Sequence, residues 1–207
     1  MRISLSALAM IIIGGMAPPV EAAGIDCAKS VSASGHMICQ DKSLLAQDTM
    51  MEALYASALK RDDADKIRSQ QQRWVATVQS CGDLTCIRHA YDDQVSFILD
   101  TKGVVSASTD FTSKRSDGNE GRLSIFGPVD GLVAVTLSSV YAGPGAGNVN
   151  ADGIQSVVPL TKEHAELSRG RCKFSLNRLN AKTWRVSQAG SCFLADGVTF
   201  RGIYRKQ

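Results

Sequence analysis

Six cysteines, placed four and two along the chain, constrain what it can fold into more than any other feature. The first group is Cys27, Cys39, Cys81 and Cys86, and the second is Cys172 and Cys192. An even number of cysteines in an exported chain indicates disulfide bonds. Because the groups lie far apart in sequence, each half of the chain can close its own bridges. We therefore expect Cys172 to pair with Cys192.

The first four cysteines allow three pairings, and the sequence does not choose firmly among them. Cys81 ends one expected helix and Cys86 begins the next, so a local bridge across the turn is favoured. Local pairing then leaves Cys27 for Cys39. The alternative joins Cys27 or Cys39 to that turn and closes a longer loop. Zinc binding by Cys81 and Cys86 is disfavoured because no second close pair of Cys or His accompanies them.

The first 22 residues have the pattern of a cleavable signal peptide. Arg2 precedes the apolar run 5–16, Pro18 and Pro19 follow it, and Ala22 completes a small-x-small cleavage site. The run is shorter than the ~20 residues that a membrane-spanning helix needs, and no later segment is apolar enough. We expect cleavage near Ala22, no transmembrane segment, and a mature protein that is periplasmic or secreted.

Apolar residues recur with helical spacing over 43–60, 65–80 and 85–100. Ser43 is placed to cap the first of these helices, and Gly103 is placed to end the third through a left-handed cap. Residues 26–39 are small and polar, which indicates a loop with one short turn. We predict a small antiparallel helical bundle over 24–103, stabilised by its disulfides.

The second half has the short alternating runs of an antiparallel β domain. We predict this domain over 118–207, as a sandwich or a small barrel, so that the fold class is α+β. Residues 101–117 are expected to form a linker or an irregular strand. Residues 143–153 are expected to form a glycine-rich loop. Its part 148–153 fits only the first half of a calcium-binding loop, and a plain turn explains it better. The expected strands are 123–126, 132–137, 157–158, 172–176, 184–187, 192–194 and 199–204.

Charge differs between the halves more than the total suggests. Residues 24–100 hold eight basic and eleven acidic side chains, a net charge of −3. Residues 101–207 hold fourteen basic and eight acidic ones, a net charge of +6. The total of +3 is too small to indicate a nucleic-acid partner.

No catalytic or cofactor motif is present. His36, His89 and His164 have no partner at motif spacing. Adjacent carboxylates such as Asp92 and Asp93 do not face each other on a helix, so we read them as solvated charges. We predict a binding protein that is not an enzyme and needs no cofactor or metal.

Residues 26–99 resemble the LprI-type lysozyme-inhibitor family, an exported helical module. The pattern consists of four cysteines together with polar and aromatic residues on the expected helices. The chain departs from it at four positions: Gly35 replaces an expected Glu, Gln47 an expected Leu, and Val78 and Gln94 expected Arg residues. The matching residues are Asp26, Cys27, Ile38, Cys39, Asp48, Tyr55, Gln71, Trp74, Cys81, Cys86 and Tyr91.

The resemblance implies a lysozyme-like hydrolase as protein partner, inhibited by occlusion of its substrate cleft. An envelope or immunity-type protein that binds peptidoglycan or another secreted partner is the alternative. Tyr55, Trp74 and Tyr91 are expected to pack in the core, while Asp48 and Gln71 are expected to be caps or buried hydrogen-bond partners. The resemblance does not indicate which surface binds.

Overall fold

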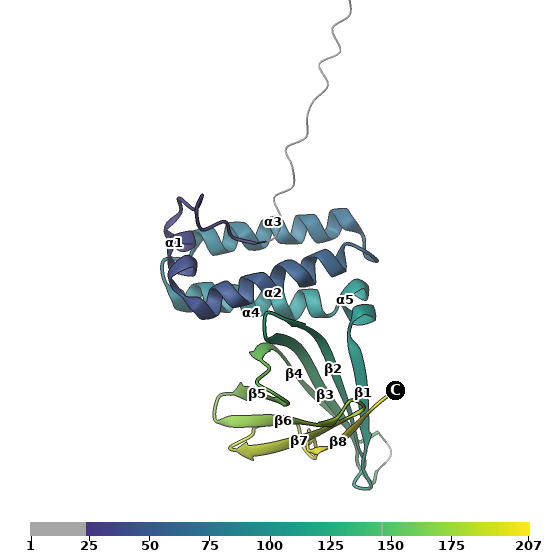
Figure 1. Cartoon of the computed structure of the whole chain (residues 1–207). Helices are drawn as coiled ribbons and strands as arrows, with labels where there is room; N and C mark the ends of the chain where they lie inside the picture. Colours follow the sequence, from purple (N-terminus) through teal and green to yellow (C-terminus); the bar gives the residue numbers. More distant parts are fainter. Residues whose placement is uncertain (1–23, 146) are drawn as a thin grey trace, which may run out of the picture.

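The structure is a computed structural model that describes residues 24–145 and 147–207, and it has a helical half stacked on a sheet half (Figure 1). The predicted signal peptide, 1–22, lies outside the described residues. Helices followed by an antiparallel sheet confirm the α+β class.

Five helices form the helical half, and the three long ones lie where the apolar periodicity predicted them. Asp side chains cap these three: Asp41, Asp63 and Asp83 each accept hydrogen bonds from backbone N–H groups in the first turn. Asp41 therefore takes the role predicted for Ser43, which itself donates to Asp41. The segment expected to be a loop holds an extra helix, α1. The bounds are α1 Ala33–Gln40, α2 Lys42–Ala58, α3 Ala64–Ser80, α4 Leu84–Leu99 and α5 Lys102–Ala107.

Gly103 has a different role from the predicted left-handed cap. It lies inside α5, where its carbonyl oxygen accepts a hydrogen bond from the Ser57 hydroxyl at 3.1 Å. A Cβ at this position would stand 2.1 Å from the carbonyl oxygen of Ser57. Glycine is needed here because α5 touches the backbone at the end of α2. The Asp62 carboxylate also holds α5 in place, because it accepts hydrogen bonds from the backbone N–H groups of Lys102 and Gly103.

Eight antiparallel strands make one sheet, in the order β4-β3-β2-β1-β8-β7-β6-β5. Its two edge strands approach each other, because Arg169 of β5 bonds to the Asp152 side chain of β4 at 2.9 Å and to the Gly153 carbonyl. Of the two predicted architectures, the sheet thus has the form of a small, nearly closed barrel. The bounds are β1 Thr109–Lys114, β2 Asn119–Val129, β3 Leu132–Ala142, β4 Val149–Pro159, β5 His164–Arg169, β6 Cys172–Asn180, β7 Thr183–Gly190 and β8 Gly202–Lys206.

Several strand predictions need correction. Strand β4 begins at Val149, so Asp152 and Gly153 belong to a strand and take no part in a calcium-type loop. Cys192 lies after the end of β7 rather than in a strand of its own. Strand β5, which sequence reasoning missed, alternates buried Ala165 and Leu167 with polar residues, too short a pattern to stand out.

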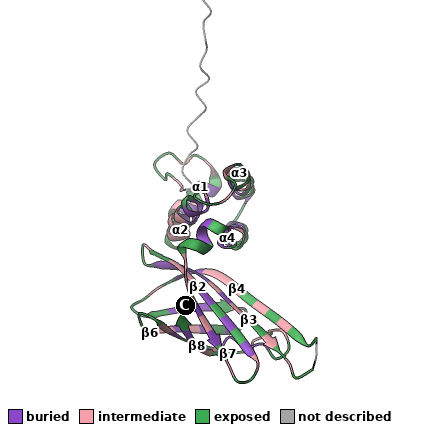
Figure 2. Ribbon diagram, turned by 90° about the vertical axis from the view of Figure 1, so that its right-hand side faces the viewer, coloured by how far each residue is buried: buried purple, intermediate pink, exposed green. Residues whose placement is uncertain are grey.

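The sheet encloses an apolar core of its own, and buried and exposed residues alternate along its strands (Figure 2). Phe174 and Phe200 meet edge to face with ring centroids 5.1 Å apart, and Phe111 meets Trp184 in the same way at 6.3 Å. Edge-to-face contacts of this kind suit the charge distribution of aromatic rings.

A second core joins the helices to the sheet. Leu132 and Ala134 of β3 and Val157 of β4 pack in the same buried cluster as the long helices. The segment 101–117, predicted to be a linker or an irregular strand, holds helix α5 and strand β1. Its Ser, Thr and Lys content gave no sign that α5 packs against α2 and β2 or that β1 pairs with β2 and β8.

Three disulfides close the fold: Cys27–Cys39, Cys81–Cys86 and Cys172–Cys192. These are the three pairs favoured from sequence. Such bonds are compatible with a location outside the cytoplasm. Across 24–145 and 147–207, no helix has both the length and the apolar character that crossing a membrane requires.

Candidate functional site

The family-pattern residues of the helical half meet in a buried cluster centred on Asp48 and Tyr91. The Tyr91 hydroxyl donates to Asp48 Oδ1 at 2.7 Å, and the Ile25 backbone N–H donates to Asp48 Oδ2 at 2.5 Å. Asp48 is 5% exposed and Tyr91 is 1% exposed. The carboxylate therefore ties the segment before α1 to helices α2 and α4.

Burial sets the electrostatics of this pair. The pKa of the Asp48 carboxyl is raised, first by burial and further by the nearby charge of Glu52, although its two hydrogen bonds work in the opposite direction. The pKa of the Tyr91 hydroxyl is also raised, by burial and then by the charge of Asp48. Tyr91 thus stays a proton donor at any physiological pH.

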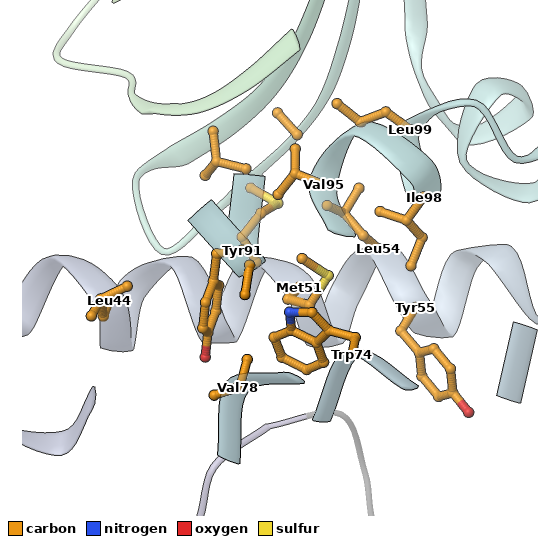
Figure 3. Packing of buried hydrophobic residues seen from close by; sticks show 14 of the residues in the cluster. Leu44, Met51, Leu54, Tyr55, Trp74, Val78, Tyr91, Val95, Ile98 and Leu99 are labelled. Atoms are coloured by element: carbon orange, nitrogen blue, oxygen red, sulfur yellow. The ribbon is translucent and has the colours of Figure 1, made fainter. Parts of the chain in front are cut away.

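Trp74 and Gln71 extend the cluster along α3. The Trp74 ring meets Tyr91 edge to face, with centroids 5.0 Å apart (Figure 3). Gln71 accepts a 3.0 Å hydrogen bond from Gln94 of α4, whose own oxygen accepts from Gln70. Neutral amides thus connect α3 and α4 where the resemblance predicts Arg at position 94.

Two donors in this cluster have no acceptor among the described residues: Gln71 Nε2 and Trp74 Nε1. Both side chains are more than nine-tenths buried. A buried donor without an acceptor costs about 1–3 kcal/mol.

The cluster contains four of the five predicted non-cysteine residues: Asp48, Gln71, Trp74 and Tyr91. Tyr55 is buried on the same helix as Asp48 but lies further along α2, and its hydroxyl forms no hydrogen bond within the described residues (Figure 3). None of the five is exposed to a partner, so the pattern specifies packing and any binding surface must lie elsewhere.

A polar groove at the junction of the two halves offers such a surface. It encloses about 470 Å³ between α4 and the strands β3 and β4. The Ser96 hydroxyl donates to Gln155 Oε1 at 2.6 Å, and Gln155 Nε2 donates to Asp100 at 2.8 Å. These bonds fix α4 against β4 and so fix the shape of the groove.

Asp92 and Asp93 make the groove acidic. Partial burial raises the pKa of Asp92, and the adjacent Asp93 charge adds to this against the opposing effect of His89. No ion pair to either carboxylate exists among residues 24–145 and 147–207. Two unpaired carboxylates beside a hollow can accept a cationic side chain from a partner. Sequence reasoning described this pair as solvated charges, which agrees with the exposure of both residues. It missed the groove, because β4, which forms the opposite wall, could not be placed from sequence.

The histidines and other titratable groups do not assemble into a metal-binding set. Within the described residues, no group of three His, Cys, Asp or Glu side chains is arranged to hold a metal ion. The His164 ring forms a hydrogen bond with the Asn177 side chain, across the pair β5 and β6.

Comparison with protein-family models, with curated proteins and with solved structures finds no match to this chain.

Proposed function

We propose that the chain is an exported inhibitor of a lysozyme or a related cell-wall hydrolase. The observation that carries the proposal is the convergence of Asp48, Gln71, Trp74 and Tyr91 in one buried cluster. The residues on which the expected resemblance rests thus lie in one packed unit, closed by two disulfides, and this supports the proposal.

Charge favours a basic partner for the helical half. Residues 24–100 have a net charge of −3, and this count includes the unpaired carboxylates Asp92 and Asp93 of the junction groove. Many lysozymes are basic, so opposite charge would speed their encounter with this half. In the proposed complex a Lys or Arg of the hydrolase enters the groove, and α4 with its neighbours covers the substrate cleft over about 800 Å² a side.

Binding to immobilised lysozymes of several classes tests the proposal. We expect the double variant Asp92→Asn, Asp93→Asn to weaken binding by about tenfold or more, the loss of one charge-assisted contact. The matched control, Asp65→Asn with Glu166→Gln, also removes two exposed negative charges but lies away from the groove. We expect it to retain wild-type affinity.

Equal loss in both double variants would mean that only overall charge matters and would remove the groove from the proposal. Capture of a non-hydrolase envelope protein, with no binding of any lysozyme, would favour the alternative function instead.

A further inference from the structure

A second hollow, unrelated to the junction groove, lies on the outer face of the sheet. It encloses about 740 Å³ over strands β1, β7 and β8. No acidic residue lines it, and five cationic ones do: Lys114, Arg115, Arg185, Arg201 and Arg205. We call this hollow the basic groove.

Strand register explains why the cations gather there. Thr112 of β1 pairs with Arg205, and Thr183 of β7 pairs with the same Arg205 from the other side. Tyr204 points into the core, so Arg205 points outward by strand alternation. Lys114 of β1 and Arg185 of β7 also point outward by strand alternation. Both lie one outward-facing position away from Arg205 along the strand direction.

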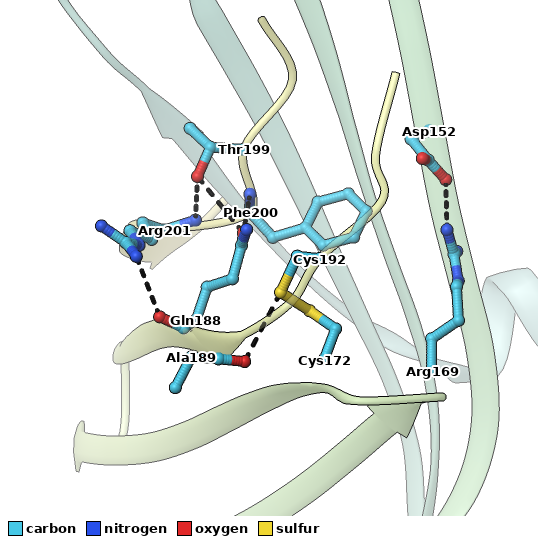
Figure 4. Close-up of a disulfide and its surroundings, with 9 residues drawn as sticks. All are labelled: Asp152, Arg169, Cys172, Gln188, Ala189, Cys192, Thr199, Phe200 and Arg201. Carbon is cyan, nitrogen blue, oxygen red and sulfur yellow. Dashed lines mark hydrogen bonds and ion pairs between the residues drawn. A yellow bond between two sulfur atoms is a disulfide. The ribbon is translucent and has the colours of Figure 1, made fainter. Parts of the chain in front are cut away.

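Three of the five cations already have protein partners. Arg115 forms a bidentate pair with Asp117, and Lys114 pairs with Glu120 at 2.7 Å. Arg201 donates to the backbone carbonyl of Gln188 at 3.1 Å, next to the Cys172–Cys192 disulfide (Figure 4). Its guanidinium is held in place but is not neutralised.

Arg185 and Arg205 are exposed, and their side chains have no hydrogen bond or ion pair within the described part of the chain. Both flank Ile203, which pairs with Arg185 across the strands. Together with Arg201 they give the groove three guanidinium groups without a carboxylate. Like charges that line one hollow repel each other, so an anion bound among them relieves the repulsion.

The lining favours phosphate over an acidic protein surface. Protein-binding hot spots are rich in exposed aromatic anchors, and no aromatic residue lines this groove. Its volume is typical of small-molecule sites. Guanidinium groups bind phosphate oxygens in pairs of parallel hydrogen bonds, which a lysine cannot do.

We propose that the basic groove binds a phosphate-bearing ligand through Arg185, Arg201 and Arg205. The site goes beyond the proposed inhibitor function, because a basic hydrolase is repelled from this face. An exported protein meets such phosphates either on anionic lipid headgroups or on soluble phosphorylated molecules.

Titration of the mature full-length chain with pyrophosphate, followed by amide NMR shifts, tests the proposal. We expect shifts confined to β1, β7, β8 and the residues 199–201, and weaker binding at higher salt. Arg185→Gln and Arg205→Gln should each weaken affinity about tenfold. Arg68→Gln, an exposed arginine on α3, is the matched control and should bind as the wild type.

Phosphatidylcholine vesicles with and without phosphatidylglycerol separate the two sources. Flotation only with the anionic vesicles assigns the site to lipid phosphates, and pyrophosphate binding without flotation assigns it to a soluble ligand. The absence of pyrophosphate-induced shifts, together with the absence of flotation with anionic vesicles, would overturn the proposal. So would equal weakening in Arg68→Gln, or binding of a glutamate-rich peptide in place of both phosphate probes.

Discussion

At the scale of single residues, Asp48 determines how the start of the described chain joins the helices. Its two oxygens accept one hydrogen bond from Tyr91 and one from the Ile25 backbone. Such a carboxylate tolerates burial only while its hydrogen bonds are made. Removing the hydroxyl that donates to Asp48 should therefore lower the stability of the fold more than removing another buried hydroxyl.

Replacing Tyr91 by Phe tests this. The change removes one donor from a buried carboxylate, and we expect the free energy of unfolding to fall by about 1–3 kcal/mol. Tyr55→Phe is the control, because Tyr55 is also buried on the helical side but its hydroxyl has no hydrogen-bond partner in the described chain. We expect it to change stability by less than about 0.5 kcal/mol in urea unfolding. Equal effects of the two variants would contradict the role given to Asp48.

The pH dependence of stability gives a second test at this scale. The folded-state pKa of Asp48 is raised above its ordinary value of 3.8, so the folded protein binds this proton more tightly than the unfolded chain does. The contribution of Asp48 to stability is therefore greatest below pH 3.8 and declines as pH rises through the folded-state pKa. We expect Asp48→Asn to remove this decline. Urea unfolding at several pH values measures it, and parallel curves for both proteins would refute the assignment.

At the scale of elements, the long helices were predictable because apolar periodicity is a local signal. Helices α1 and α5 and strand β5 were not, because short elements depend on contacts with distant residues. The acidic groove was missed for the same reason, since its walls come from α4 and β4. The disulfide pairs could be predicted because two lie close in sequence and the third follows from the four-and-two split.

Helix α5 provides the prediction at this scale. Gly103→Ala would place a methyl group 2.1 Å from the Ser57 carbonyl oxygen, and backbone on both sides must shift. We expect a loss of about 1–3 kcal/mol in unfolding free energy. Gly82→Ala is the matched control, because a Cβ there meets nothing within 4 Å. A Gly103→Ala protein as stable as Gly82→Ala would mean that α5 is not packed against α2.

At the scale of the whole molecule, the two halves share a core. Leu132, Ala134 and Val157 belong to the sheet but pack among the helices. A shared core couples the unfolding of both halves, which the predicted linker would not have done. The shared core also fixes the junction groove, because its walls come from opposite sides of this contact.

The two tryptophans can report on this coupling, since Trp74 lies in the helical half and Trp184 in the sheet. Trp184→Phe leaves only the helical reporter, and Trp74→Phe leaves only the sheet reporter. In each variant we expect tryptophan fluorescence and far-ultraviolet circular dichroism to give the same urea midpoint. Fluorescence and dichroism midpoints that differ within one protein would indicate two independent domains.

The lytic activity of lysozymes in the presence of the purified mature protein tests the proposed inhibition. We predict that at least one lysozyme class loses activity at micromolar inhibitor. We also predict that Asp92→Asn with Asp93→Asn relieves this inhibition, while Asp65→Asn with Glu166→Gln does not. Undiminished lysis by every class tested, with a protein that is folded by circular dichroism, would contradict it.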